Sequence, residues 1–255
     1  MSNLHHFIRC SAVAVLFALL AAGCSSGDKL MPSDLTVPQL EAKMAKAMDP
    51  DGRYTSSTGS IIRQEIKIPK FLEESEEQMV ETKIAKPDKV LISTYENNEL
   101  LHTIGFDGRN GWRADHKKRR VDILDGKQLM QVLNMSKLAN MTDSYASIFD
   151  KVEIFRCTNG DGSFYLLKCR NTEGSEFNIY IDAATFFVRY LRGKIKVGSA
   201  TVDYTSEIIA YDRHQGVLLP QKTVTRQNGQ KQEVKIIDYK LNVKFGSEDF
   251  LPPVF

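Results

Sequence analysis

Residues 200–243 read ATVDYTSEIIAYDRHQGVLLPQKTVTRQNGQKQEVKIIDYKLNV, and this stretch decides the fold. Three runs rich in β-branched and aromatic residues are separated by the turn-forming segments DRHQG and RQNGQK. In the first run, Thr201, Asp203 and Thr205 alternate with Val202 and Tyr204, so one face of the strand is polar. The stretch therefore predicts an antiparallel meander with one solvated face and one covered face.

Strand patterns extend outward from this stretch. Further strands are expected just before it, at VEIFRC, SFYLLKCR, EFNIYID and FVRYLRGKIK, and nearer the N-terminus, at YTSSTGSIIRQEIKI, MVETKIA, DKVLISTYE, LLHTIGF, GWRAD and RRVDIL. Helical periodicity is found at 36–48 and in an insert at 125–141 followed by TDSYASIFD; the insert carries an apolar stripe at Leu129, Val132 and Leu133. A sheet of ten or more strands curls. We therefore expect a mainly antiparallel α+β fold, with the N-terminal helix and the helical insert covering the concave face.

The N-terminus has the order of features of an exported lipoprotein. Arg9 precedes the apolar run SAVAVLFALLAA, residues 11–22, which is too short to span a bilayer. The run ends in LAAGC at 20–24, which resembles the bacterial lipobox, although that pattern prefers Leu where Ala21 stands. We expect a signal peptide at 1–23, with diacylglyceryl and N-acyl groups on Cys24 and no other cofactor. The alternative is an ordinary secretory signal with an incidental cysteine.

The segment after Cys24 is expected to be a lipidated linker, residues 24–35, because SSGDKLMPSD is small, polar and contains proline. About 10 residues reach at most about 35 Å, which would hold a single folded domain at 36–255 beside its membrane. Loss of Arg9 with the signal lowers Lys+Arg from 34 to 33, against 32 Asp+Glu. A net charge near +1 gives no reason to expect a nucleic acid partner, and we expect a monomer.

Two cysteines remain beyond Cys24, and a disulfide between them depends on a hairpin register. If the turn in NGDG is centred between Gly160 and Asp161, Cys157 lies opposite Phe164 and Cys169 lies opposite Val152. The two thiols would then lie on opposite faces of the sheet. A disulfide would require a longer loop centred near residue 163, and the oxidising periplasm would permit one.

Catalytic and metal motifs are not evident. After the signal, the histidines are His102, His116 and His214, in no metal-like spacing, and the chain has no Gly-x-Ser-x-Gly elbow or phosphate loop. We therefore expect no metal site and no enzymatic activity. The run HKKRR at 116–120 has two interpretations: a contact for anionic lipid headgroups, or a solvated strand edge whose charges oppose aggregation.

Four segments in order resemble the LolA/LolB-like superfamily of outer-membrane lipoprotein-sorting proteins. They are KPDKV at 86–90, FDGRNGW at 106–112, the helical insert at 125–141 and the closing segment LNVKFGSEDFLPP at 241–253. The resemblance implies an incomplete β-barrel that holds acyl chains between its sheet and its helices. Two features depart from it: the soluble carrier has no lipobox, and the candidate loop FLEESEEQ at 71–78 is mostly acidic where the anchored receptor has an apolar finger.

The resemblance and the strand patterns together nominate residues that line such a cavity: Val90, Ile92, Ile104, Phe106, Trp112, Leu129 and Leu133. Each also fits an ordinary buried core. We expect a membrane-anchored periplasmic protein that binds lipid or lipoprotein acyl chains and acts in outer-membrane lipoprotein sorting. Ser25 after the anchor, rather than Asp, favours the periplasmic face of the outer membrane over the inner membrane. The alternative is an envelope sensor or scaffold that binds another protein through its sheet and carries no lipid.

Overall fold

The computed structural model describes residues 28–69, 75–126, 128–130, 144–171, 174–197 and 200–255. In chain order its strands are β1 Lys29–Pro32, β2 Gly59–Ile68, β3 Glu76–Ala85, β4 Lys89–Glu96, β5 Glu99–Phe106, β6 Gly111–Asp115, β7 Arg120–Leu124, β8 Lys151–Asn159, β9 Gly162–Arg170, β10 Glu176–Asp182, β11 Val188–Val197, β12 Ala200–His214, β13 Val217–Gln227 and β14 Gln230–Leu241. The helices are α1 Val37–Met48 and α2 Arg53–Ser56, with 3₁₀ turns η2 Tyr145–Ser147 and η3 Ser247–Phe250.

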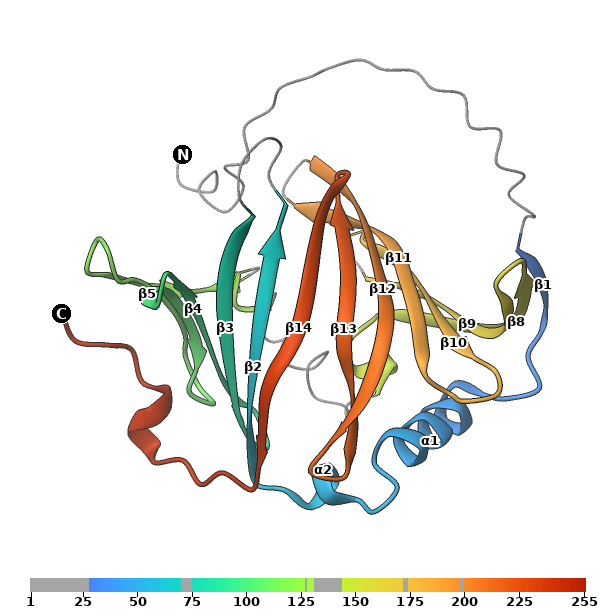
Figure 1. Cartoon of the computed structure of the whole chain (residues 1–255), viewed down its shortest axis with the longest axis horizontal. Helices are drawn as coiled ribbons and strands as arrows, with labels where there is room; N and C mark the ends of the chain where they lie inside the picture. Colours follow the sequence, from blue (N-terminus) through green and yellow to red (C-terminus); the bar gives the residue numbers. More distant parts are fainter. Residues whose placement is uncertain (1–27, 70–74, 127, 131–143, 172–173, 198–199) are drawn as a thin grey trace.

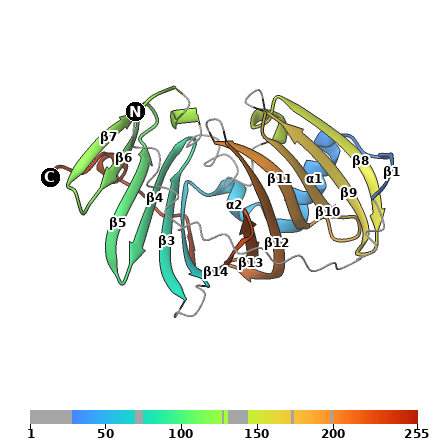
Figure 2. The same ribbon diagram turned by 90° about the horizontal axis from the view of Figure 1, so that it is seen from above.

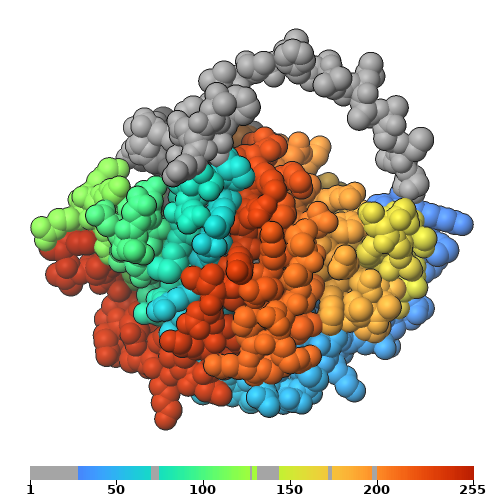
Figure 3. Space-filling view, in the orientation of Figure 1, coloured from blue at the N-terminus to red at the C-terminus, as the bar shows by residue number. Residues whose placement is uncertain are grey.

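All fourteen strands belong to one antiparallel sheet, in the order β1-β8-β9-β10-β11-β12-β13-β14-β2-β3-β4-β5-β6-β7. Two meanders are thus joined where β14 pairs with β2, and Figure 3 shows these strands side by side in the middle of one face. β1 and β7 are the two edges, and the pairings among the described residues leave the sheet open between them (Figures 1 and 2). The expected α+β fold, a curled and incomplete barrel, is confirmed.

The curl has a local origin in β-bulges. The pairing register slips between Ile208 and Ala210 in β12, and between Ile236 and Asp238 in β14. A bulge adds a residue to one strand, which bends that strand and increases its twist. A further slip lies opposite Thr94 and Tyr95 of β4, where the extra residue, Leu101, belongs to β5. The sheet therefore turns its two ends toward the same side.

The helix α1 packs against the concave face, as the sequence predicts. Thr36 caps it: the Thr36 hydroxyl accepts from the Gln39 backbone N–H at 3.4 Å, and the Gln39 side chain accepts from the Thr36 N–H at 2.9 Å. Leu40 and Met44 are buried with side chains of β9 and β10, namely Tyr165, Leu167, Cys169, Ile179 and Ile181. The short helix α2 places Tyr54 against Val217, Leu219, Ile236 and Tyr239 on the same face (Figure 2).

Two elements differ from the expectations, and a third, the helical insert, is described only in part. Lys29–Pro32, inside the predicted linker 24–35, forms β1 and pairs with β8, so that Leu30 lies opposite Cys157. The predicted helix at TDSYASIFD is only the single turn η2 in its described part. The helical insert is helical at Gly126 and at 128–130, and its remainder, with Val132 and Leu133, lies outside the described residues. The strand β1 was not predicted because four residues carry little local sequence signal and its partner, β8, is distant in the chain.

The hairpin register of the cysteines is confirmed. Cys157 pairs with Phe164, and Cys169 pairs with Val152. Cys169 belongs to the apolar cluster beneath α1, whereas Cys157 lies on the outer face with Leu166 and Tyr180. Both cysteines are free thiols, and burial raises the pKa of Cys157 to about 11 and that of Cys169 to about 12.

Candidate binding face

Strands β4 and β5 bring together four of the nominated residues on the concave face. Val90 pairs with Phe106, and Ile92 pairs with Ile104, so all four side chains project from the same side of the sheet. Ile84 of β3 and Leu124 of β7 join them, and Leu129 packs against the group. We call these seven residues the concave apolar patch.

Some side chains of the patch are buried and others remain partly accessible. Val90 and Phe106 are 1% and 8% exposed, whereas Ile92, Ile104 and Leu129 are only partly buried. Strand β6 contributes no side chain at Gly111, where a Cβ atom would lie 2.6 Å from the Leu129 side chain. Glycine at this position therefore allows the first turn of the insert to approach the sheet closely. Leu133, one turn further on, lies outside the described residues.

Polar side chains bound the patch on the same face. Arg113 lies opposite Ile104, and its guanidinium donates to the Asp122 carboxylate at 3.2 Å. Arg120 donates to the same carboxylate at 2.8 Å. Partial burial opposes ionisation of Asp122, but these two hydrogen bonds hold its pKa below the usual value. An acyl chain lying on the patch would therefore end beside a fixed ionic group.

Trp112 is not part of this patch. Its neighbours in β6, Gly111 and Arg113, project from the concave face, so Trp112 projects from the outer face. There it lies over Gly105 and donates its indole N–H to the Phe250 carbonyl at 2.9 Å. Figure 3 shows the C-terminal segment, in red, beside the green strands that it covers. The structure thus separates Trp112, which is 2% exposed, from the other described residues predicted to line the cavity.

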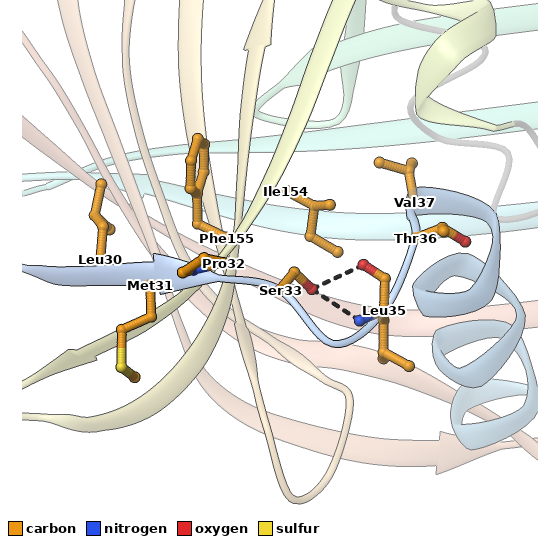
Figure 4. A pocket seen from close by; sticks show the side chains of 9 residues that line it. All are labelled: Leu30, Met31, Pro32, Ser33, Leu35, Thr36, Val37, Ile154 and Phe155. Carbon is orange, nitrogen blue, oxygen red and sulfur yellow. Dashed lines mark hydrogen bonds between the residues drawn. The ribbon is translucent and has the colours of Figure 1, made fainter.

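A second accessible apolar surface lies at the opposite edge of the sheet. An open groove of about 640 Å³ separates β1 from the start of α1 (Figure 4). Its lining residues are Leu30, Met31, Pro32, Ser33, Leu35, Thr36, Val37, Ile154 and Phe155. This groove was not expected from the sequence, because residues 24–35 were predicted to form a linker. The apolar pair Leu30-Met31 within an otherwise polar segment is the signal that could have indicated it.

The described residues contain no group of three or more His, Cys, Asp or Glu side chains placed to hold a metal ion. His116 is within hydrogen-bonding distance of the Thr103 hydroxyl at 2.8 Å, and His214 of the Gln221 side chain at 2.7 Å. In the part of the chain that the structure describes, no helix is both long and apolar enough to cross a membrane.

The remaining features predicted from the sequence are the basic run at 116–120, the anchor residue Cys24 and the apolar residues of the acidic loop. The run HKKRR forms the exposed turn between β6 and β7 and the first residue of β7. Cys24, and Phe71 and Leu72 of the acidic loop, lie outside the described residues.

Comparison with known proteins agrees with this architecture. No protein-family model and no curated protein sequence matches the chain. Solved structures do match. A LolA superfamily protein from Nitrosomonas europaea superposes with a TM-score of 0.61 at 13% identity, over 86% of this chain and 98% of that one. A DUF1329 family protein from Desulfovibrio piger gives 0.59 at 11%, over 84% and 97%.

A third structure is described as an outer membrane lipoprotein-sorting protein domain, from Vibrio parahaemolyticus. It superposes with a TM-score of 0.54 at 14% identity, over 82% of this chain and 94% of that one. The chain therefore has the open-barrel fold of the LolA superfamily structures, and the expected resemblance is confirmed at the level of fold. Identities this low carry the fold and not the activity.

Proposed function

We propose that this protein is a lipid-anchored periplasmic protein that binds acyl chains against the concave apolar patch. The observation that carries the proposal is the convergence of Val90, Ile92, Ile104, Phe106 and Leu129 on one face, with three of them still partly exposed. Burial of an acyl chain stabilises a complex by roughly 0.8 kcal/mol per methylene and requires no metal or catalytic group. The proposed role is therefore non-enzymatic.

The anchor and the location complete the proposal. The order of Arg9, the apolar run and Cys24 supports diacylglyceryl and N-acyl groups on that cysteine after removal of 1–23. Ser25 supports the periplasmic face of the outer membrane. A monomer fixed there is suited to receiving or holding lipid or lipoprotein acyl chains during outer-membrane lipoprotein sorting, because its short tether prevents it from crossing the periplasm.

Lipid analysis of the protein and a matched pair of variants test the binding face. The protein is extracted gently from membranes, and co-purifying lipids are identified by mass spectrometry. The variant Ile92→Ser/Ile104→Ser removes two accessible side chains of the patch. Ile61→Ser is the control, because Ile61 is also partly buried but lies on the outer face opposite Lys83.

We expect the double variant to bind a fluorescent long-chain fatty acid at least about tenfold more weakly, because it loses two apolar contacts. A tenfold change in affinity corresponds to a loss of about 1.4 kcal/mol of binding free energy. The Ile61 variant should bind like the parent. Circular dichroism is used to check that both variants are folded. Extraction with no acyl species, together with equal fatty acid binding by both variants, would contradict the proposal.

A further inference from the structure

The chain enters the sheet at a fixed point on its outer face. The Asp28 carboxylate accepts hydrogen bonds from the Tyr180 hydroxyl at 2.6 Å and from the Asn159 side-chain amide at 3.0 Å. Asn159 also donates to the Tyr190 hydroxyl at 2.9 Å, and the Arg192 guanidinium lies 4.7 Å from the Tyr190 ring centre. Asp28 is therefore bonded to β8 and β10 directly, and to β11 only through Asn159, and β1 begins at the next residue.

This attachment shortens the tether to the membrane. If Cys24 carries the lipid, as the proposed function holds, only Ser25, Ser26 and Gly27 lie between it and Asp28, so its Cα atom is joined to that of Asp28 by four residue-to-residue steps. They span at most about 14 Å when fully extended, against about 35 Å for a linker that ends at residue 35. The lipid headgroup region is itself about 5–7 Å thick per leaflet. The edge of the sheet that carries β1 must therefore lie at the bilayer surface.

The chemistry of this edge matches such a position. Leu30 and Met31 are 38% and 41% exposed and project to opposite sides of β1 (Figure 4). None of the nine residues lining the adjoining groove is charged. Ser33 provides hydrogen-bond partners for the backbone of the following turn. Its hydroxyl donates to the Leu35 carbonyl at 2.8 Å and accepts from the Leu35 N–H at 3.0 Å. An apolar, accessible patch without charges marks an interaction site.

We propose that the β1 edge, comprising Leu30, Met31 and the groove beside α1, is a membrane-docking surface that inserts into the headgroup region of the bilayer. The proposal rests on lipidation of Cys24, and it adds an orientation to the anchor. Lys29 is exposed at the same edge and can reach lipid phosphates. Partial insertion of exposed apolar side chains at a lipid interface is a known mode of peripheral binding.

The docked orientation directs the other end of the molecule away from the membrane. Figures 1 and 2 place β1 and the β6–β7 hairpin at opposite ends of the sheet. The basic run at 116–120 would therefore point toward the periplasm, where it cannot meet the headgroups of the same membrane.

Site-directed spin labelling measures this orientation directly. Met31→Cys labels the docking edge. Ile123→Cys, on the opposite edge strand and 65% exposed, is the control. Cys157 and Cys169 are 0% and 3% exposed and have raised pKa values, so they remain unlabelled in the folded protein, and acylated Cys24 has no free thiol. The full-length lipidated protein is reconstituted into phosphatidylethanolamine–phosphatidylglycerol vesicles.

The measured quantity is the ratio of the collision rate with oxygen to the collision rate with a water-soluble nickel chelate. We expect this ratio to be severalfold higher for the label at position 31 than for the label at position 123. Equal access of nickel to both labels would overturn the docking proposal while the anchor stands. Dipolar broadening at position 31 would assign the edge to a second copy and would also overturn it. A protein without acyl mass that does not float with vesicles would refute the anchor, and with it the docking. Fatty acid binding by the patch variants reports separately on the proposed function.

Discussion

At the scale of single residues, Trp112 shows how the position of a side chain depends on what covers it. Its indole lies between Gly105 and the C-terminal segment and donates to the Phe250 carbonyl at 2.9 Å. Phe250 is fully buried and contacts the ring of Phe245. The hydrogen bond from Trp112 therefore holds the C-terminal segment against the outer face of the sheet. Gly105 is required beneath the indole, because a β-carbon there would collide with it.

Replacement of Trp112 should affect stability and leave acyl binding unchanged. Trp112→Phe leaves the buried Phe250 carbonyl without its donor, so we expect the free energy of unfolding to fall by about 1–3 kcal/mol. Urea denaturation followed by circular dichroism measures the loss. Val254→Ala, in the same C-terminal segment and 99% exposed, should change stability by less than about 0.5 kcal/mol. Loss of fatty acid binding by Trp112→Phe at unchanged stability would instead place the indole in the lipid site.

The two thiols make a second prediction at this scale. Because Cys157 and Cys169 project from opposite faces, both should remain reduced and unreactive toward Ellman's reagent in the folded protein. Both should react after unfolding in urea. Intact mass before and after alkylation gives the count of free thiols. A mass lower by two hydrogens in the native protein would show a disulfide and refute the register.

At the scale of elements, the local signals determine what sequence reasoning could predict. The turn segment NGDG favoured the observed β8–β9 register, since few turn types close a hairpin of that composition, but it left a longer loop centred near residue 163 open. The alternation along β4 and β5 likewise predicted that Val90, Ile92, Ile104 and Phe106 share a face. The β1 strand and the cover over Trp112 could not be predicted. Both depend on contacts with distant segments, β8 and the C-terminal residues respectively.

The packing of helix α1 on the sheet can be tested by its effect on stability. Leu40 is fully buried beneath the helix against β9 and β10, so Leu40→Ala should lower the free energy of unfolding by about 2–5 kcal/mol. Lys46→Ala, on the exposed side of the same helix, should change it by about 0.5 kcal/mol or less. Similar effects of the two variants in urea denaturation would mean that α1 does not pack on the sheet.

At the scale of the whole molecule, the buried hydroxyls and thiols predict a stability that falls in alkali. Burial raises the pKa of Cys169 to about 12, and it also raises the pKa values of Tyr145, Tyr211 and Tyr239. Unfolding exposes these groups, and they ionise near their ordinary values of about 8.5 for Cys and about 10 for Tyr. The unfolded state then binds fewer protons than the folded state as the pH rises.

We therefore expect the contribution of Cys169 to be fully present below about pH 8.5 and to be lost progressively as the pH approaches about 12. Each such group contributes a slope of at most about 1.4 kcal/mol per pH unit. Urea denaturation at a series of alkaline pH values measures the slope. Cys169→Ala should make it shallower while leaving the profile near neutral pH flat. An unchanged slope in this variant would show that Cys169 ionises equally in both states.

The pairing of β14 with β2 has a consequence for export. If the protein is exported as proposed, β2 emerges first and β14 last among the strands of the two meanders, so β2 can pair with β3 while its other edge has no partner until β14 arrives. An unpaired edge is a template for adding a foreign strand. Arg63, Glu65 and Lys67 alternate along β2, and such charges discourage that addition. We therefore expect the charges on β2 to protect the middle of the sheet until the last strand arrives.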